Sequence, residues 1–134
     1  MIKMLEMEYK STRVKPYRLA DGTYKGFPYY VLSLGTHPCA YVDVSEIPED
    51  GIDTNRIDCH GGITYSDKYL VTVDNVGWFI GWDYAHCYDY VGNLPGFPIY
   101  GKRRWRTSEI IMECKNVIDQ IIKLAGTSES GKDD

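Results

Sequence analysis

Carboxylate and imidazole side chains alternate at a spacing of three residues in one short segment, as Asp83, His86 and Asp89. Where the backbone turns helically, this spacing brings successive side chains onto one face. Carboxylate and imidazole together suit zinc, manganese or iron, although a carboxylate can instead orient a ligating histidine. The structural alternative is that Asp83 caps a turn at the end of a strand while His86 makes ordinary polar contacts.

A second histidine, His60, is followed by two glycines. Glycine lets the backbone approach a neighbour closely or adopt a positive φ, which suits a ligating histidine on a tight loop. A small anion-binding nest of amides or a plain turn fits the same residues. We expect His60 and His86 to bind one divalent ion, with zinc as the first choice and with Asp83 or Asp89 completing the ligand set.

Two further residues, His37 and Cys39, are reserve ligands, because residues two apart in an extended chain share a face. The alternative is a buried cysteine beside a histidine in a turn. The other cysteines are Cys59, Cys87 and Cys114, and none of the four forms a CxxC pair. We therefore expect free thiols rather than a disulfide framework.

Four cations surround a tryptophan in the segment 102–106, which reads KRRWR. Such a segment can stack on bases or hold phosphate, and it can equally dock on an acidic protein surface. The structural alternative is a solvated loop in which Trp105 staples the start of the following helix.

The overall charge and hydropathy exclude some classes of protein. The 134 residues carry a net charge of −4, whereas a protein that binds duplex DNA normally has a basic excess. No apolar run approaches the ~20 residues of a membrane span, and acidic residues lie where a signal peptide would have its apolar core. We therefore predict a cytoplasmic protein that binds neither a membrane nor duplex DNA. The 12 tyrosines favour half-buried strands or a tyrosine-rich interface.

Alternating and β-branched segments predict a mainly antiparallel sheet. The run GWFIGWDY at 77–84 is apolar on both faces apart from Asp83, which is typical of a central strand. The segment 10–27 is predicted to be a polar connection with a turn at Asp21-Gly22. The predicted strands cover residues 3–9, 29–34, 39–44, 69–73 and 77–84.

A C-terminal helix is the clearest predicted element. Thr107 is expected to cap its start and Gly126 to follow its end. Between them, aliphatic residues recur at the spacing of one apolar stripe. These elements predict a single α+β domain over 1–126, in which one long helix packs on the sheet. A disordered acidic tail is expected at 127–134.

Two motifs resemble a family of small proteins common in phages and prophages. Residues 59–66 read CHGGITYS, and residues 78–89 read WFIGWDYAHCYD. In that family an HGG-[LI]-T-[YF]-S motif is followed by a W-[WF]-x-G-[WF]-D-x-x-H-x-x-D motif. An upstream H-x-C-G-Y-V segment of the family resembles residues 37–42, with Ala40 in place of glycine.

The resemblance also includes the Glu113-Cys114 pair of the closing helix, and it covers roughly residues 30–125. Cys59 and Cys87 stand where the family has small or aliphatic residues, which argues against them as ligands. By residue, the family pattern falls on His37, Cys39, His60, Gly61, Gly62, Asp83, His86 and Asp89. The resemblance implies a phage setting and inhibition of host defences, as by a metal-containing type II anti-CRISPR inhibitor.

Three functions are compatible with these observations. The first is a phage-encoded, metal-binding inhibitor that binds a bacterial defence protein, such as a CRISPR effector nuclease. The second is a metal-dependent hydrolase or phosphoesterase acting on a small nucleotide or phosphoester, and the third is a protein that sequesters a small signalling molecule. The sequence has no P-loop, GxSxG motif or dinucleotide fingerprint, which favours a binding protein over an enzyme.

Overall fold

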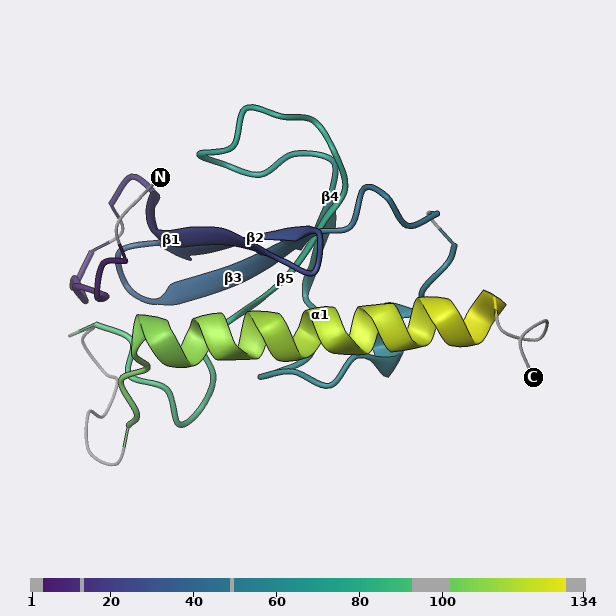
Figure 1. Ribbon diagram of the computed structural model, residues 1–134. Helices are drawn as coiled ribbons and strands as arrows, with labels where there is room; N and C mark the ends of the chain where they lie inside the picture. Colours follow the sequence, from purple (N-terminus) through teal and green to yellow (C-terminus); the bar gives the residue numbers. More distant parts are fainter. Residues whose placement is uncertain (1–3, 13, 49, 93–101, 130–134) are drawn as a thin grey trace.

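The computed structural model describes residues 4–12, 14–48, 50–92 and 102–129. It confirms the α+β fold predicted from the sequence, with an antiparallel sheet and one long C-terminal helix (Figure 1). The elements are β1 (Tyr17–Tyr24), β2 (Phe27–Ser33), β3 (Pro38–Asp43), the 3-10 helix η1 (Thr54–Arg56), β4 (Tyr65–Asp67), β5 (Phe79–Asp83) and α1 (Thr107–Glu129).

The sheet has the strand order β1-β2-β3-β5-β4, and every neighbouring pair is antiparallel. The apolar run predicted to be central is indeed β5, which lies between β3 and β4. Its Phe79, Ile80 and Trp82 are all buried, because both faces of this strand are covered.

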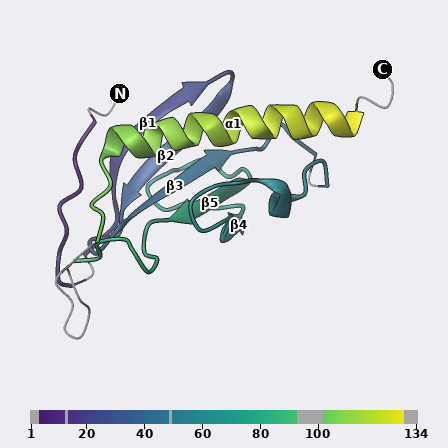
Figure 2. The ribbon, with the colours of Figure 1, turned by 90° about the horizontal axis from the view of Figure 1, so that it is seen from below.

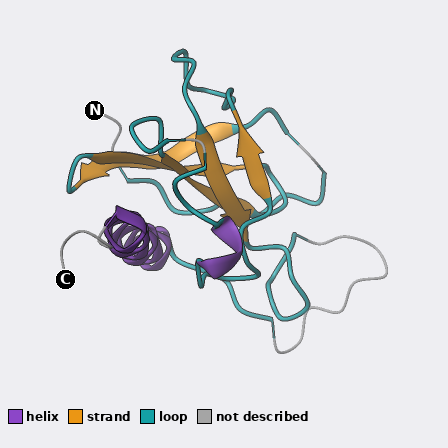
Figure 3. Ribbon diagram, turned by 90° about the vertical axis from the view of Figure 1, so that its right-hand side faces the viewer, coloured by secondary structure: helices purple, strands orange, loops and turns teal. Residues whose placement is uncertain are grey.

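Helix α1 lies across one face of the sheet (Figures 2 and 3). The predicted apolar stripe faces the sheet, with Ile110, Cys114, Val117, Ile118 and Ile121 fully buried. These helix residues share one core with strand residues that include Val31, Ala40, Val42, Ile80 and Trp82. The core between α1 and the sheet therefore covers one face of the sheet, and the opposite face carries a second core.

The second, smaller core contains Leu32, Cys39, Tyr41, Leu70 and Phe79. The loop between β4 and β5 contributes Leu70 and rises from the side of the sheet away from the helix (Figure 1). Cys39 pairs with Asp83 across the β3–β5 register, and Tyr41 pairs with Gly81. Side chains of paired residues in a sheet project to the same face, so the Asp83 side chain lies on the face away from α1, as that of Cys39 does.

The prediction for the first third of the chain was wrong in two places. The segment predicted as the strand 3–9 forms no strand over its described residues, and the predicted connection 10–27 contains β1 instead. The hairpin turn falls at Lys25-Gly26, where φ is 50° and 88°, rather than at Asp21-Gly22. A two-residue turn with positive φ at both positions matches the twist of the flanking strands.

The loop predicted as the strand 69–73 is a tight turn closed by a bridge between Leu70 and Val73. Thr72 within it has a φ of 69°. Left-handed backbone interrupts a strand, because side chains can no longer alternate across a pleat.

The helix ends differ from the prediction as well. Arg106, not Thr107, is the N-cap residue of α1. Its backbone N–H donates to the Glu109 carboxylate at 2.9 Å, and its carbonyl accepts from Ile110 N at 3.2 Å. The Thr107 hydroxyl instead donates to the Leu5 carbonyl and ties the N-terminal segment to the helix. The helix passes through Gly126 to Glu129, so the predicted tail overlaps it, and residues 130–134 lie outside the described part.

Candidate functional site

The structure brings the four predicted site residues together as two histidine–carboxylate pairs. His60 Nε2 lies 2.7 Å from Asp89 Oδ2, and His86 Nε2 lies 3.4 Å from Asp83 Oδ1. The centroids of the two imidazole rings are 5.3 Å apart. Residues separated by up to 29 positions therefore form one continuous cluster.

Asp89 is the anchor of this cluster and is only 4% exposed. Its Oδ2 accepts from the His86 backbone N–H at 2.9 Å and pairs with His60, while its Oδ1 accepts from Trp105 Nε1 at 2.8 Å. Burial raises the pKa of Asp89, but these three hydrogen bonds outweigh burial and hold the pKa below its usual value. Asp89 is therefore an ionised carboxylate with its acceptors in use.

This pairing determines the tautomer of His60. Because an ionised carboxylate only accepts hydrogen bonds, His60 Nε2 carries a proton, and in the neutral ring Nδ1 is the nitrogen left to accept a hydrogen bond or bind an ion. The ring is stacked on Tyr84, with centroids 4.8 Å apart and planes 9° from parallel. It also contacts Trp105 edge-on at 5.0 Å. The orientation of His60 is thus fixed by packing and by Asp89.

Asp83 is held more loosely. Its Oδ1 accepts from the Ala85 backbone N–H at 3.1 Å as well as facing His86, and its Oδ2 lies 3.4 Å from Thr64 Oγ1. The contact with Ala85 is the strand-end cap that the sequence offered as the structural alternative. The side chains of Asp83 and His86 are 30% and 39% exposed, so this pair is open to solvent.

The glycines after His60 have the backbone geometry that the sequence predicted. Gly61 has a φ of 72° and Gly62 a φ of 80° within a turn in which Gly62 N donates to Cys59 O at 2.9 Å. A Cβ on Gly61 would overlap His86 Nε2, so the His86 ring can occupy its position only because residue 61 has no side chain.

Glu113 of α1 belongs to the cluster, although the sequence analysis placed it only within a resemblance. One carboxylate oxygen accepts from the His60 backbone N–H at 3.1 Å, and the other accepts from Trp82 Nε1 at 3.2 Å and from the Tyr84 hydroxyl. The signal that could have revealed it is its position three residues after Ile110 and four before Val117, which puts a carboxylate on the apolar face.

The cluster has the donor types of a metal site, but each histidine is paired with a carboxylate, His60 with Asp89 and His86 with Asp83. Within the described ranges, no three His, Cys, Asp or Glu side chains are arranged to hold an ion. For His60 to bind a metal while paired with Asp89, it would do so through Nδ1, and Asp89 would orient the ring from outside the ligand set. The metal site built on His60, Asp83, His86 and Asp89 stays a prediction.

The reserve ligands lie apart from the His60–Asp89 pair. His37 Nδ1 lies 3.0 Å from Thr36 Oγ1, and Cys39 is buried on the face away from α1. Both line a pocket of about 280 Å³ that reaches Asp83. The structure therefore brings His37 and Cys39 close to Asp83 rather than to His60.

None of the four cysteines, all of which lie within the described residues, is joined in a disulfide. Burial, helped by Glu113 and Asp58, raises the pKa of the Cys59 thiol to about 12. A thiol with such a pKa stays protonated at neutral pH and is a poor nucleophile.

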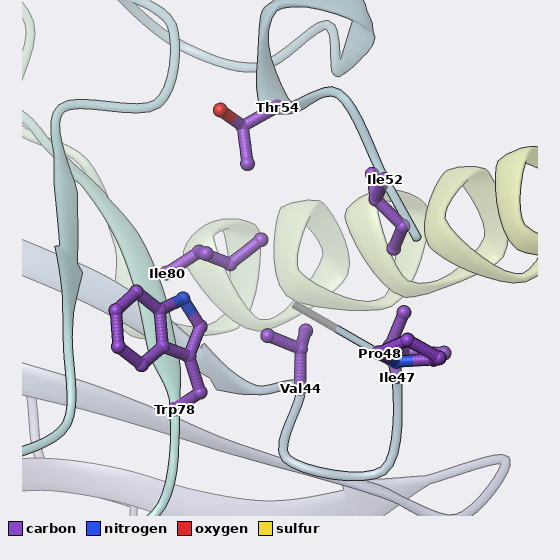
Figure 4. Close-up of a pocket in the computed structure, with 7 residues that line it drawn as sticks. All are labelled: Val44, Ile47, Pro48, Ile52, Thr54, Trp78 and Ile80. Carbon is purple, nitrogen blue, oxygen red and sulfur yellow. The ribbon is translucent and has the colours of Figure 1, made fainter. Parts of the chain in front are cut away.

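A different pocket lies where the β3–β4 connection meets β5 (Figure 4). Apolar side chains make up most of its wall, with Trp78 and Ile80 facing Ile47, Pro48 and Ile52. It contains no member of the His/Asp cluster, and its volume of about 30 Å³ is that of about one water molecule. This pocket is a packing gap beside the core.

Comparison with known proteins finds no matching family model, no match among curated proteins and none among solved structures. In the described part of the chain, no helix has both the length and the apolar character needed to cross a membrane.

Proposed function

We propose that this chain is a phage-encoded binding protein of the host cytoplasm that inhibits a bacterial defence system by occupying the surface of a defence protein. The observation that carries the proposal is the exposed turn that the His/Asp cluster supports. Ala85, His86, Cys87 and Tyr88 are all exposed, and the Asp89 carboxylate holds the base of the turn through the His86 N–H. A rigid support lowers the entropy that a surface loses on binding.

Basic residues lie directly beside this turn. Arg103 N donates to Tyr88 O at 2.8 Å, Tyr90 N donates to Arg103 O at 2.9 Å, and the Lys102 ammonium donates to the Cys87 carbonyl. The Arg103 guanidinium lies 3.6 Å from the centroid of Trp105, which in turn donates to Asp89. The cationic segment is therefore fastened to the cluster.

Tyrosine and arginine are the residue types that dominate binding energy at protein interfaces. Tyr88 is 77% exposed, and Arg103, Arg104 and Arg106 are exposed as well. An aromatic side chain flanked by cations suits an acidic patch on a partner protein. The phage resemblance of the two motifs supplies the setting, and a CRISPR effector nuclease is the first defence protein to test.

The test compares two exposed tyrosines. The purified chain is added to a guide-loaded type II effector nuclease, and cleavage of target DNA is measured against inhibitor concentration. We expect inhibition, and we expect Tyr88→Ala to weaken it by about tenfold or more, as loss of an interface anchor does. Tyr69→Ala, which removes a tyrosine that is 63% exposed on another loop, should leave inhibition unchanged.

Equal loss in both variants, or an unmodified chain that neither binds nor inhibits the nuclease, would contradict the proposal for this partner. Folding is checked by the melting temperature, which neither substitution at an exposed position should shift appreciably.

The second candidate is a divalent-ion site within the same cluster, serving either the inhibitor or a metal-dependent hydrolase of small phosphoesters. It is favoured by the two imidazole rings 5.3 Å apart, each beside a carboxylate. Such a site would use His60 and His86 with a carboxylate, and the ion would stabilise the fold, because the unfolded chain lacks the site.

Elemental analysis of protein purified without a histidine tag tests the ion. About one zinc per chain, lost in His60→Ala and in His86→Ala but kept in His37→Ala, would support the site. A content below about a tenth of an ion per chain, with melting unchanged by a chelator, would leave the cluster as a hydrogen-bonded network.

A further inference from the structure

The pocket on the sheet face away from α1 combines a carboxylate with aromatic rings. Its volume is about 280 Å³, close to the lower bound of small-molecule sites. At ~30 Å³ per water molecule this is room for on the order of ten non-hydrogen atoms. Its lining includes His37, Cys39, Tyr41, Thr64, Tyr65 and Asp83.

The register of the sheet explains why a hollow forms here. Gly81 of β5 pairs with Tyr41 on one side and with Tyr65 on the other. A Cβ on Gly81 would overlap the Tyr41 ring, so the absent side chain lets that ring lie down over β5. The two tyrosine rings meet edge to face, with centroids 5.2 Å apart. They form an aromatic wall beside the carboxylate at the end of the strand.

The carboxylate has acceptor capacity on the side of the pocket. Asp83 Oδ1 faces Ala85 N at 3.1 Å and His86 Nε2 at 3.4 Å. Among the described residues, the hydrogen-bond partner of Oδ2 is Thr64 Oγ1, at the long distance of 3.4 Å. A carboxylate oxygen can accept two hydrogen bonds, so Oδ2 can accept a stronger donor from a ligand.

The charged side chains that line the pocket indicate the sign of the charge that a ligand would carry. Among the described residues that line it, Asp83 is the acidic side chain, and none is lysine or arginine. Burial, followed by the neighbouring Cys39, raises the pKa of Tyr41 far above its usual value, so its phenol is neutral and its ring face is electron-rich. Carboxylate oxygens and aromatic faces both attract cations that carry N–H donors.

We infer that this pocket binds a small, flat organic cation of the amidinium, guanidinium or amine class, with its N–H groups on Asp83 and its apolar body against Tyr41 and Tyr65. The inference does not depend on the defence partner, because the pocket lies at Asp83 and Thr64 rather than at Tyr88.

Benzamidine is a suitable probe, because it is flat, cationic and of about the size the pocket admits. Titration of the full chain, followed by amide chemical shifts, should show saturable shifts around residues 37–41, 64–65 and 81–83, with a Kd on the order of millimolar for so small a ligand. Benzoate, which has the opposite charge, should not bind.

Asp83→Asn should weaken benzamidine at least tenfold, and Tyr65→Leu should weaken it several-fold through loss of one ring. Asp67→Asn is the matched control, because Asp67 is an exposed carboxylate on the neighbouring β4 that does not line the pocket, and it should not change the affinity. Equal affinity for benzoate, unchanged affinity in Asp83→Asn, or shifts that do not saturate would each overturn the inference. None of these outcomes bears on inhibition of a defence protein.

Discussion

The two carboxylates of the Asp-x-x-His-x-x-Asp segment have the same chemistry and opposite environments. Asp89 is 4% exposed and accepts three hydrogen bonds of 2.7–2.9 Å on the side of α1. The Asp83 side chain is 30% exposed, and it faces His86 and Thr64 at 3.4 Å beside a pocket on the other side of the sheet.

This difference separates a structural role from a binding role. A buried carboxylate whose lone pairs are satisfied stabilises the elements that donate to it, and it has little capacity for a ligand. A half-buried carboxylate with long contacts contributes little to stability but can pair with an incoming group. We therefore assign support of the fold to the Asp89 half of the cluster and recognition to the Asp83 half.

The largest effect is expected from removing the buried anchor. Asp89→Ala leaves the His86 N–H, His60 and Trp105 without their common acceptor, which should cost about 3–5 kcal/mol of unfolding free energy. Asp83→Ala, the matched change at the half-buried position, should cost about 1 kcal/mol or less. Urea unfolding of both variants measures the difference. Similar losses at the two positions would remove the distinction drawn between them.

A smaller effect on unfolding free energy is expected at Gly61 and Gly62, where the loop after His60 approaches His86. Gly61→Ala and Gly62→Ala both place alanine at a positive φ, at 72° and 80°, which should cost about 1–2 kcal/mol each. Only the Cβ at Gly61 would overlap His86 Nε2, whereas at Gly62 no contacting atom of the described residues lies within 4 Å of that position.

Imidazole resonances in NMR spectra distinguish these two variants. Gly61→Ala should displace the His86 ring from Asp83 and change its resonances, and Gly62→Ala should leave them nearly as in the unmodified chain. If both variants perturb His86 alike, the close approach at Gly61 is not what positions it.

The smallest effect is on the response to acid. Because the folded pKa of Asp89 is lowered, the stability from its ionised form is present above the ordinary carboxyl value of 3.8 and is lost as the pH falls through the folded pKa. The gap in unfolding free energy between the unmodified chain and Asp89→Asn should thus be constant above that value and shrink below it. Urea unfolding at a series of pH values measures the gap.

An apolar substitution provides the control for that experiment. Ile118→Val removes one methylene from the core and should cost about 0.5–1.5 kcal/mol at every pH, because no proton is linked to it. The loss of unfolding free energy in Asp89→Asn could instead be as independent of pH as the loss in Ile118→Val. That result would show that the Asp89 pKa is not lowered.

Much of the scaffold could be predicted from local patterns. The stripe that contains Ile118 and Ile121 has the period of a helix, and the run at 77–84 is apolar on both faces as a central strand must be. These predictions held because burial of a periodic apolar face is the largest favourable contribution to folding, and the period is visible in consecutive residues. The positive φ expected after His60 held for the same local reason, since glycine permits it.

The first strand shows where local patterns fail. The Asp21-Gly22 pair is typical of a turn, yet it lies inside β1 because Lys25-Gly26 closes the hairpin. Pairing of β1 with all of β2 decides between the two turns. That choice depends on partners that lie outside the short window a turn signal uses.

The sequence alone determined which chemical groups this protein could use: His60, Asp83, His86 and Asp89 were identified from residue type and spacing. Only the tertiary structure decided how these groups pair. Spacing put His86 equally close to Asp83 and Asp89, but β5 directs Asp83 away from α1, while the following turn brings Asp89 to the side chains of His60 and Trp105. Glu113 entered the cluster for the same reason, because contacts between a helix and a loop 53 residues away arise from packing and leave no local pattern in the sequence.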